Sequence, residues 1–208
     1  MKPIIPYDDF LRSKIKVKDD TSLPITSIPD VLKPHQKDAV RFAANRGKAL
    51  LALSFGLGKT IIQASLAKIA NEATGQKTLT ICPLGVRQEF THPSTGEPNR
   101  LYPADIGVHY QYCTSDFEIE NASSPHIITN YERVRDGNIT PALHNFALVT
   151  MDEASIIGNL GTKTYNQFET LLKDIPYKYI CTATPAPNEY RQLIIMQICW
   201  ELDKKVKV

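Results

Sequence analysis

The sequence predicts an α/β fold with a mostly parallel central sheet that is covered by helices on both faces. Short apolar runs recur along the chain, each ending in polar or glycine residues, and helical patterns such as Thr60–Ile69 and Thr164–Leu172 separate several of them. Parallel strands buried on both faces have this continuous apolar pattern, and helices make the crossovers. The predicted strands are Ala49–Leu53, Thr78–Cys82, Ile106–Tyr110, His126–Thr129, Ala147–Met151 and Tyr177–Cys181.

The segments at the two ends of the chain have different patterns. We expect residues 1–31 to form a proline-punctuated leader that packs on the main domain, with a short helix at Asp8–Ile15 and an edge strand at Lys14–Lys18. Pro34 is expected to start the first helix of the main domain, because proline suits the first helical turn. Residues 191–208 are expected to form one helix with a basic end.

Composition sets limits on the class of protein. The 208 residues are 42% hydrophobic and 22% charged, with a formal net charge of +2, which is typical of a globular protein and predicts no overall basic surface. No apolar run reaches the roughly 18 residues of a membrane span. We therefore expect no membrane partner. The four cysteines are widely spaced, so we expect free thiols in a reducing cytoplasm.

The segment after the first predicted strand has the pattern of a phosphate-binding (Walker A) loop. It consists of Gly56, Leu57, Gly58, Lys59 and Thr60. Glycines let backbone N–H groups converge on an anion at a helix N-terminus. Lys59 is expected to reach the β- and γ-phosphates, and the Thr60 hydroxyl to bind Mg²⁺. Leu53 departs from the usual motif, which has Gly or Ala at that position.

An acidic pair follows the fifth predicted strand. Asp152 is expected to hold Mg²⁺, and Glu153 to orient and deprotonate an attacking water. Such a pair alone is also compatible with a solvated acidic turn. The phosphate loop earlier in the chain favours the catalytic interpretation and predicts ATP–Mg²⁺ as the ligand.

Four further motifs complete an ordered set with these two. They are Leu32–Gln36, Cys82–Leu84, His126–Glu132 and Cys181–Asn188. In this order the set resembles the first RecA-like lobe of superfamily-two helicases over residues 32–190. The resemblance is greatest to the Swi/Snf-like branch and, within it, to DEAD/DEAH-box-like proteins carried by phages. It implies a three-layer P-loop NTPase fold in a bacterial or phage-infected host cytoplasm.

The resemblance also implies roles for the matching residues. Gln36 would bind the adenine edge, and Lys59, Asp152 and Glu153 would form the catalytic set. Thr182, Ala183 and Thr184 would couple the nucleotide site to the lobe interface. The segments expected along a nucleic-acid backbone, which we expect to be double-stranded DNA, are Pro83, Leu84 and Gly85 together with Thr129, Asn130 and Tyr131. Contacts to phosphate would be independent of base sequence.

Several positions depart from the family pattern. Ser155 replaces the common His or Asp, Leu53 and Ser54 replace an Asp-Glu pair, and Gly158 stands where relatives often have a basic residue. Relatives also have a second RecA-like lobe, and the residues after Asn188 are too few to form one. Because that lobe supplies an arginine finger worth roughly 10³–10⁵ in rate, we expect this chain to bind ATP but hydrolyse it slowly alone.

Three functions therefore compete. In the first, the chain is the ATP-binding lobe of a helicase or double-strand DNA translocase, and its second lobe is missing or supplied in trans. In the second, it is a single-lobe ATP- or nucleic-acid-binding module without motor activity. A P-loop kinase or other nucleotide-transferring enzyme is disfavoured by the Thr182–Pro185 segment after a late strand. Base stacking on Tyr110, Tyr112 or Tyr131 is an open alternative to half-buried packing of these rings. The five histidines have no metal-binding spacing.

Overall fold

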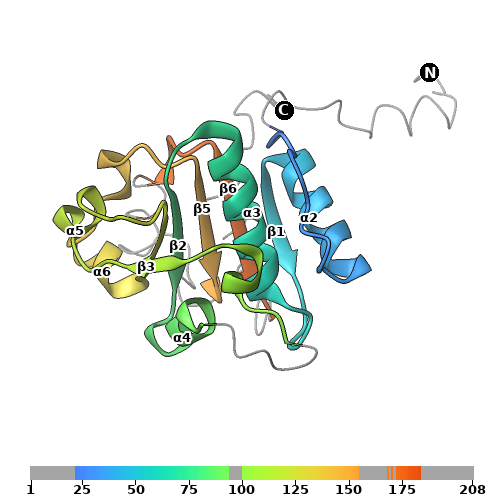
Figure 1. Ribbon diagram of the computed structural model, residues 1–208. Helices are drawn as coiled ribbons and strands as arrows, with labels where there is room; N and C mark the ends of the chain where they lie inside the picture. The colour runs from blue at the N-terminus through green and yellow to red at the C-terminus, as the bar shows by residue number, and fades with distance from the viewer. Residues whose placement is uncertain (1–21, 94–99, 155–167, 169, 171, 184–208) are drawn as a thin grey trace, which may run out of the picture.

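The computed structural model describes residues 22–93, 100–154, 168, 170 and 172–183. Its centre is a six-stranded sheet in the order β1-β6-β5-β2-β4-β3 (Figure 1). The strands are β1 (Lys48–Ala52), β2 (Thr78–Cys82), β3 (Tyr110–Tyr112), β4 (His126–Asn130), β5 (Leu148–Asp152) and β6 (Tyr177–Thr182). Every pairing between these described strands is parallel, which confirms the predicted fold class.

The described helices are two long ones, of which α2 precedes β1 and α3 connects β1 to β2, and several short ones. The α-helices are α2 (Pro34–Arg46), α3 (Lys59–Thr74), α4 (Arg87–Thr91), α5 (Asp116–Glu120) and α6 (Tyr131–Arg135), and the 3₁₀ helices are η1 (Leu84–Val86), η2 (Pro103–Ile106) and η3 (Pro141–Leu143). Pro34 does start α2, and Gly47 ends it in the left-handed conformation. Helix α3 crosses one face of the sheet beside α2 (Figure 1).

Apolar side chains cover both faces of the sheet. On β5, Leu148 packs into the cluster that includes α2 and α3, whereas Val149 and Met151 pack into a second cluster with Phe168 and Leu172. Successive side chains of a strand point to opposite faces, so one continuous apolar run supplies both clusters. The predicted three-layer arrangement therefore follows directly from the composition of the strands.

The predicted strand Ile106–Tyr110 was wrong in its position. Residues Pro103–Ile106 form η2 instead, and Gly107 ends that helix with a φ of 76°. The strand begins only at Tyr110, where the chain pairs with β4. Elsewhere, Thr78–Cys82 is observed as predicted, and the other predicted strands differ from the observed ones by one residue at one or both ends. The short helix Asp8–Ile15, the edge strand Lys14–Lys18 and the tail 191–208 lie outside the described residues.

The remaining general predictions concern cysteines, the leader and the membrane. Cys82, Cys113 and Cys181 are buried free thiols, and Cys199 lies outside the described residues. The described end of the leader contacts the main domain, because Leu23 is buried and its N–H donates to the Ala44 carbonyl at 2.8 Å. Within the described ranges, no helix combines the length and hydrophobicity needed to span a membrane.

Candidate functional site: the carboxyl ends of the strands

The loop between β1 and α3 depends on two glycines. Gly56 and Gly58 have φ values of 81° and 84°, a region in which side chains with a Cβ are strained. Gly58 directly precedes α3, and a Cβ on it would collide with the Nε2 atom of Gln36. Glycine is therefore required at position 58 for both the backbone conformation and the space around it.

Lys59 is the first residue of α3 and lies back over its own loop. Its Nζ donates to the carbonyl oxygen of Leu53 at 3.3 Å and lies 4.8 Å from the centre of the Phe55 ring. The Phe55 ring is itself 80% exposed. Thr60 follows in the first turn of α3 and is half-buried. These contacts of the ammonium group are weak enough for a phosphate to replace them.

Gln36 braces the tip of the loop from α2. Its buried amide accepts from the Lys33 N–H at 3.0 Å and donates to the Leu57 carbonyl at 3.3 Å. His35 lies within hydrogen-bonding distance of the same carbonyl, at 3.3 Å. The structure thus brings the His35 and Gln36 side chains to one acceptor. Adenine binding by Gln36 remains a prediction.

Asp152 ends β5 and is 5% exposed. The Nε2 atom of Gln63 on α3 donates to its Oδ1 at 2.8 Å. Burial raises the Asp152 pKa to about 6, although the Gln63 hydrogen bond and the Lys59 charge both act to lower it. Gln63 and Lys59 thus stabilise the charged form of Asp152 only in part, and a bound divalent cation would stabilise it further.

Gln63 was not among the residues selected from the sequence. The available signal was its position three residues after Thr60, which places both residues on one face of α3. The pattern alone did not indicate that this face meets the end of β5, which lies 89 residues later. Contact between these two segments depends on the packing of α3 against the sheet.

Glu153 has the one positive φ among the described non-glycine residues, 48°. Its N–H donates to the Cys181 carbonyl at 2.8 Å, and its Oε1 accepts from the Thr182 hydroxyl at 3.2 Å. The predicted base therefore contacts the first residue of the predicted coupling segment. Ala183 is half-buried beside it, and Thr184 lies outside the described residues.

The residues present fit a magnesium ion bound together with ATP. Among the described residues, no group of three or more His, Cys, Asp or Glu side chains is arranged for a metal ion. Magnesium in nucleotide sites needs only one or two carboxylates besides phosphate oxygens and water. Asp152 is such a carboxylate, and the Oε1 of Gln63 beside it is buried without a hydrogen-bond partner in the described part of the chain.

The two segments expected along nucleic acid differ in exposure. Pro83, Leu84 and Gly85 follow β2 at the surface, and Leu84 is 53% exposed. Nearby, the guanidinium of Arg87 on α4 lies 4.5 Å from the centre of the Tyr112 ring. This segment can therefore reach a partner outside the domain.

The side chains of Thr129, Asn130 and Tyr131 are buried and bonded within the domain. The Thr129 hydroxyl donates to the Cys113 carbonyl at 2.8 Å, and the Asn130 Oδ1 accepts from the Tyr112 hydroxyl at 3.2 Å. The Tyr131 hydroxyl donates to the Asp152 carbonyl at 2.7 Å, and its ring is 4% exposed. Base stacking on Tyr131 is therefore wrong for this structure, because packing beneath β5 encloses the ring.

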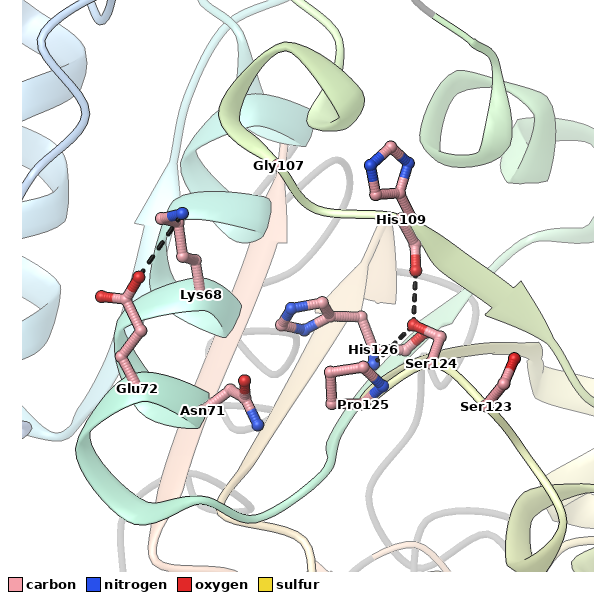
Figure 2. Close-up of a pocket in the computed structure, with 9 residues that line it drawn as sticks. All are labelled: Lys68, Asn71, Glu72, Gly107, His109, Ser123, Ser124, Pro125 and His126. Carbon is pink, nitrogen blue, oxygen red and sulfur yellow. Dashed lines mark hydrogen bonds and ion pairs between the residues drawn. The ribbon is translucent and has the colours of Figure 1, made fainter.

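Two further clusters of polar side chains lie away from the carboxyl ends of the central strands. At the amino ends of β2 and β4 lies a hollow of about 370 Å³, lined in part by Lys68, Glu72 and His126 (Figure 2). Lys68 pairs with Glu72 at 3.4 Å, and the His126 Nδ1 lies 3.0 Å from the Thr78 hydroxyl. Figure 2 shows these side chains on α3 and at the start of β4, facing the hollow from opposite sides.

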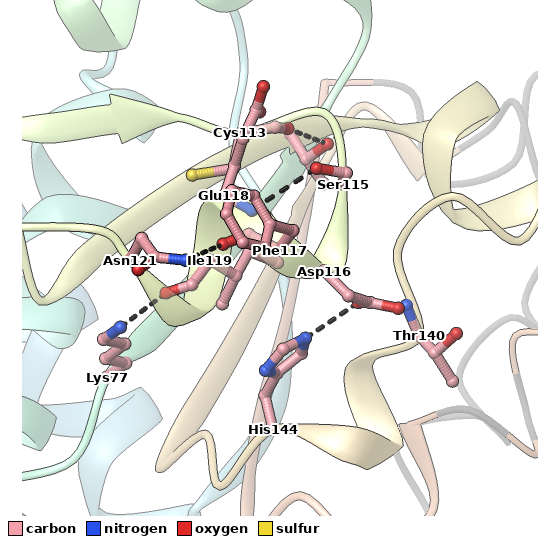
Figure 3. A network of polar contacts seen from close by, with 11 residues as sticks. Lys77, Cys113, Ser115, Asp116, Phe117, Glu118, Ile119, Asn121, Thr140 and His144 are labelled. Atoms are coloured by element: carbon pink, nitrogen blue, oxygen red, sulfur yellow. Dashed lines mark hydrogen bonds and ion pairs between the residues drawn. The ribbon is translucent and has the colours of Figure 1, made fainter.

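A second polar network holds α5 against the segment that precedes β5 (Figure 3). The Asp116 Oδ1 accepts from the Thr140 N–H at 2.8 Å and lies 2.7 Å from the His144 Nε2. On the other side of α5, the Lys77 Nζ donates to the Ile119 carbonyl at 2.5 Å. These polar groups are bonded to one another within the domain. The network therefore holds the connecting segments in place and does not indicate a ligand site.

Comparison with known proteins identifies the fold. The sequence matches no protein-family model, and its comparison with curated proteins gives no significant match. The SWI2/SNF2 ATPase core of Sulfolobus solfataricus, solved in complex with double-stranded DNA, superposes with a TM-score of 0.64 at 20% identity, covering 85% of this chain and 37% of its own. The UvsW helicase of bacteriophage T4 superposes with a TM-score of 0.58 at 20% identity, covering 94% and 65%.

A second structure of the Sulfolobus solfataricus SWI2/SNF2 ATPase core domain agrees, with a TM-score of 0.63, 23% identity and coverage of 85% and 36%. The present chain thus spans between 36% and 65% of the length of the chains in these three structures. The aligned part carries the parallel sheet and flanking helices described above. The chain therefore has a RecA-like α/β fold, which it shares with these SWI2/SNF2 ATPase core and helicase structures over part of their length.

Proposed function

We propose that this chain is the ATP-binding motor lobe of a nucleic-acid-dependent ATPase, a helicase or a double-strand DNA translocase. The observation that carries the proposal is the 2.8 Å hydrogen bond between Gln63 and Asp152. It joins the helix after the phosphate loop to the acidic end of β5. A chance glycine turn and an unrelated acidic turn would have no reason to meet in this way.

The residues divide the chemistry between them. The N–H groups from Gly56 to Gly58 and the N-terminus of α3 bind phosphate oxygens, and Lys59 leaves the Leu53 carbonyl to contact the β- and γ-phosphates. Thr60 and Asp152 hold Mg²⁺, which supplies positive charge for the phosphoryl group when bound. Glu153 orients and deprotonates the attacking water, while the Thr182 hydroxyl holds its carboxylate.

The nucleic-acid partner is expected at the exposed segment after β2. Pro83–Gly85 and the Arg87 guanidinium lie at the carboxyl ends of the strands, on the same edge of the sheet as the phosphate loop. We propose double-stranded DNA because the Sulfolobus solfataricus SWI2/SNF2 ATPase core was solved in complex with it. A second RecA-like lobe would supply the remaining transition-state charge.

The test is nucleotide binding and turnover by the purified chain. Binding of a fluorescent ATP analogue is measured with and without Mg²⁺, and ATP turnover with and without duplex DNA. We expect Mg²⁺-dependent binding and slow turnover. Absence of nucleotide binding in the folded chain would overturn the proposal. Tight binding with no effect of DNA on affinity or turnover would favour the alternative, an ATP-binding module without motor activity.

A further inference from the structure

Gln63 is a fully buried amide of which only one half is used by the protein. Its exposed fraction is 0%, and its Nε2 donates to Asp152. Its Oε1 is enclosed and has no hydrogen-bond partner in the described part of the chain. Since a buried carbonyl oxygen without a partner costs free energy, native proteins rarely keep one without a function.

The position of this oxygen is defined by its neighbours. Oε1 and Nε2 belong to one amide group, so Oε1 also lies beside the Asp152 carboxylate. Thr60 lies three residues earlier on the same face of α3, and Lys59 is close enough for its charge to act on Asp152. The unpartnered oxygen therefore belongs to a side chain that contacts Asp152 and lies one helical turn from Thr60, and both of these residues fit a magnesium–nucleotide complex.

We propose that Gln63 is a positioning residue of this site, whose Nε2 orients the Asp152 carboxylate and whose Oε1 accepts a hydrogen bond from a water of the Mg²⁺ hydration shell. The inference rests on the proposed function. Magnesium keeps several of its waters when it binds to proteins, and groups around the metal's direct ligands orient those ligands.

An amide is the side chain that suits this position. It donates to a carboxylate and accepts from water at the same time, and it adds no charge beside Asp152. A methionine of similar length would do neither. A glutamate would place a second negative charge in contact with Asp152. The competing explanation is that Gln63 merely anchors α3 to β5.

The test compares Gln63→Met with the wild-type chain by binding of a fluorescent, non-hydrolysable ATP analogue, with and without Mg²⁺. We expect the gain in affinity on adding Mg²⁺ to fall about 10- to 100-fold, while affinity without Mg²⁺ stays within about twofold. Ser65→Ala is the matched control, because Ser65 is equally buried on α3 and bonds only to the Ile61 carbonyl of its own helix. It should keep the wild-type gain.

A purely structural role gives a different result. If Gln63→Met weakens binding equally with and without Mg²⁺, or keeps the wild-type gain, the proposal is overturned. Should Gln63→Met not unfold cooperatively, Gln63→Asn replaces it; this variant keeps the amide but withdraws it by one methylene, and a full wild-type gain there overturns the proposal.

The proposed function and the inference fail in distinguishable ways. A folded wild-type chain that binds no nucleotide overturns both. Mg²⁺-dependent binding by the wild type that is unchanged in the Gln63 variants overturns only the role of Gln63. An Asp152→Asn variant completes the test: adding Gln63→Met to it should cause a smaller loss than in the wild type, because part of the Gln63 effect acts through Asp152, and an equal loss would overturn that part of the proposal.

Discussion

Each end of the parallel sheet carries a buried titratable group, but the surroundings of the two groups differ in their effect on the charged form. At the amino ends, burial lowers the His126 pKa to about 4, helped by the charges of Lys68 and His109. His126 is therefore neutral at physiological pH and shares a contact with Thr78. At the carboxyl ends, burial raises the Asp152 pKa to about 6, and its neighbours Lys59 and Gln63 favour the charged form.

The comparison shows that the pairing of polar groups, and not the volume of a hollow, distinguishes the two ends of the sheet. The amino-end hollow of Figure 2 has volume, but its charged groups Lys68 and Glu72 are paired with each other. At the carboxyl ends, Lys59 donates to one backbone carbonyl and lies over the exposed Phe55 ring, and one oxygen of Gln63 has no partner in the described part of the chain. Groups with replaceable or missing partners therefore favour the carboxyl ends as the proposed nucleotide site more strongly than the volume of the hollow favours the amino ends.

The largest expected effect separates two lysines on α3. Lys59→Ala should weaken ATP binding by about 2–5 kcal/mol, roughly 30-fold or more, because it removes a charge that pairs with phosphate. Lys68→Ala, at the amino end of the sheet, should change it less than twofold. Titration of both variants with a fluorescent ATP analogue tests this. Similar losses in the two variants would contradict the assignment of the site to the carboxyl ends.

The next effect concerns the pH dependence of stability. Because the folded-state pKa of His126 lies below its unfolded value, the unfolded chain binds the proton first, so stability is present above about pH 6.5 and is lost as pH falls towards 4. His126 should cost about 2 kcal/mol of unfolding free energy between pH 7 and pH 5.

The control for this effect is His126→Gln, compared with wild type by urea unfolding at both pH values. Asp152 acts in the opposite sense, since its raised pKa makes the folded state gain stability as pH falls from about 6. That contribution is common to both proteins and cancels in the comparison. Lys68, Glu72 and His109 also remain in both. Parallel pH dependence in the two proteins would show that His126 is not the group responsible.

A smaller effect compares the two glycines that flank α3. Gly58 and Gly75 both have positive φ, but a Cβ meets the Gln36 amide only at Gly58. Gly75→Ala should cost about 1 kcal/mol for the left-handed conformation, and Gly58→Ala about 2 kcal/mol because a contact is added. Chemical denaturation without nucleotide measures both. Equal costs would mean that the Gln36 amide moves away freely.

The smallest effect concerns the contact beneath β5. Tyr131→Phe removes only the hydroxyl that donates to the Asp152 carbonyl and should cost about 1 kcal/mol of unfolding free energy. Tyr112→Phe, which removes a partly exposed hydroxyl bonded to Asn130, is the control and should cost less. A neutral Tyr131→Phe variant would mean that water replaces the lost donor at this carbonyl.

Much of the fold and part of the site could be predicted because they depend on short stretches of chain. The apolar runs of β2, β5 and β6 need burial on both faces, which only a covered sheet provides. The glycines, Lys59 and Thr60 were recognisable because a phosphate loop requires them at fixed spacing. The strand at Ile106–Tyr110 was misplaced because apolar content alone does not distinguish η2 from β3.

The sequence by itself determined the fold class, and it indicated the proposed phosphate loop and the acidic strand end, because each of these follows from local conformation and residue chemistry. Only the tertiary structure decided that Gln63 contacts Asp152, that Glu153 contacts Thr182, and that Tyr131 is buried beneath Asp152. These contacts join segments from separate parts of the chain. They depend on the strand order β1-β6-β5-β2-β4-β3, which no local pattern of side chains encodes.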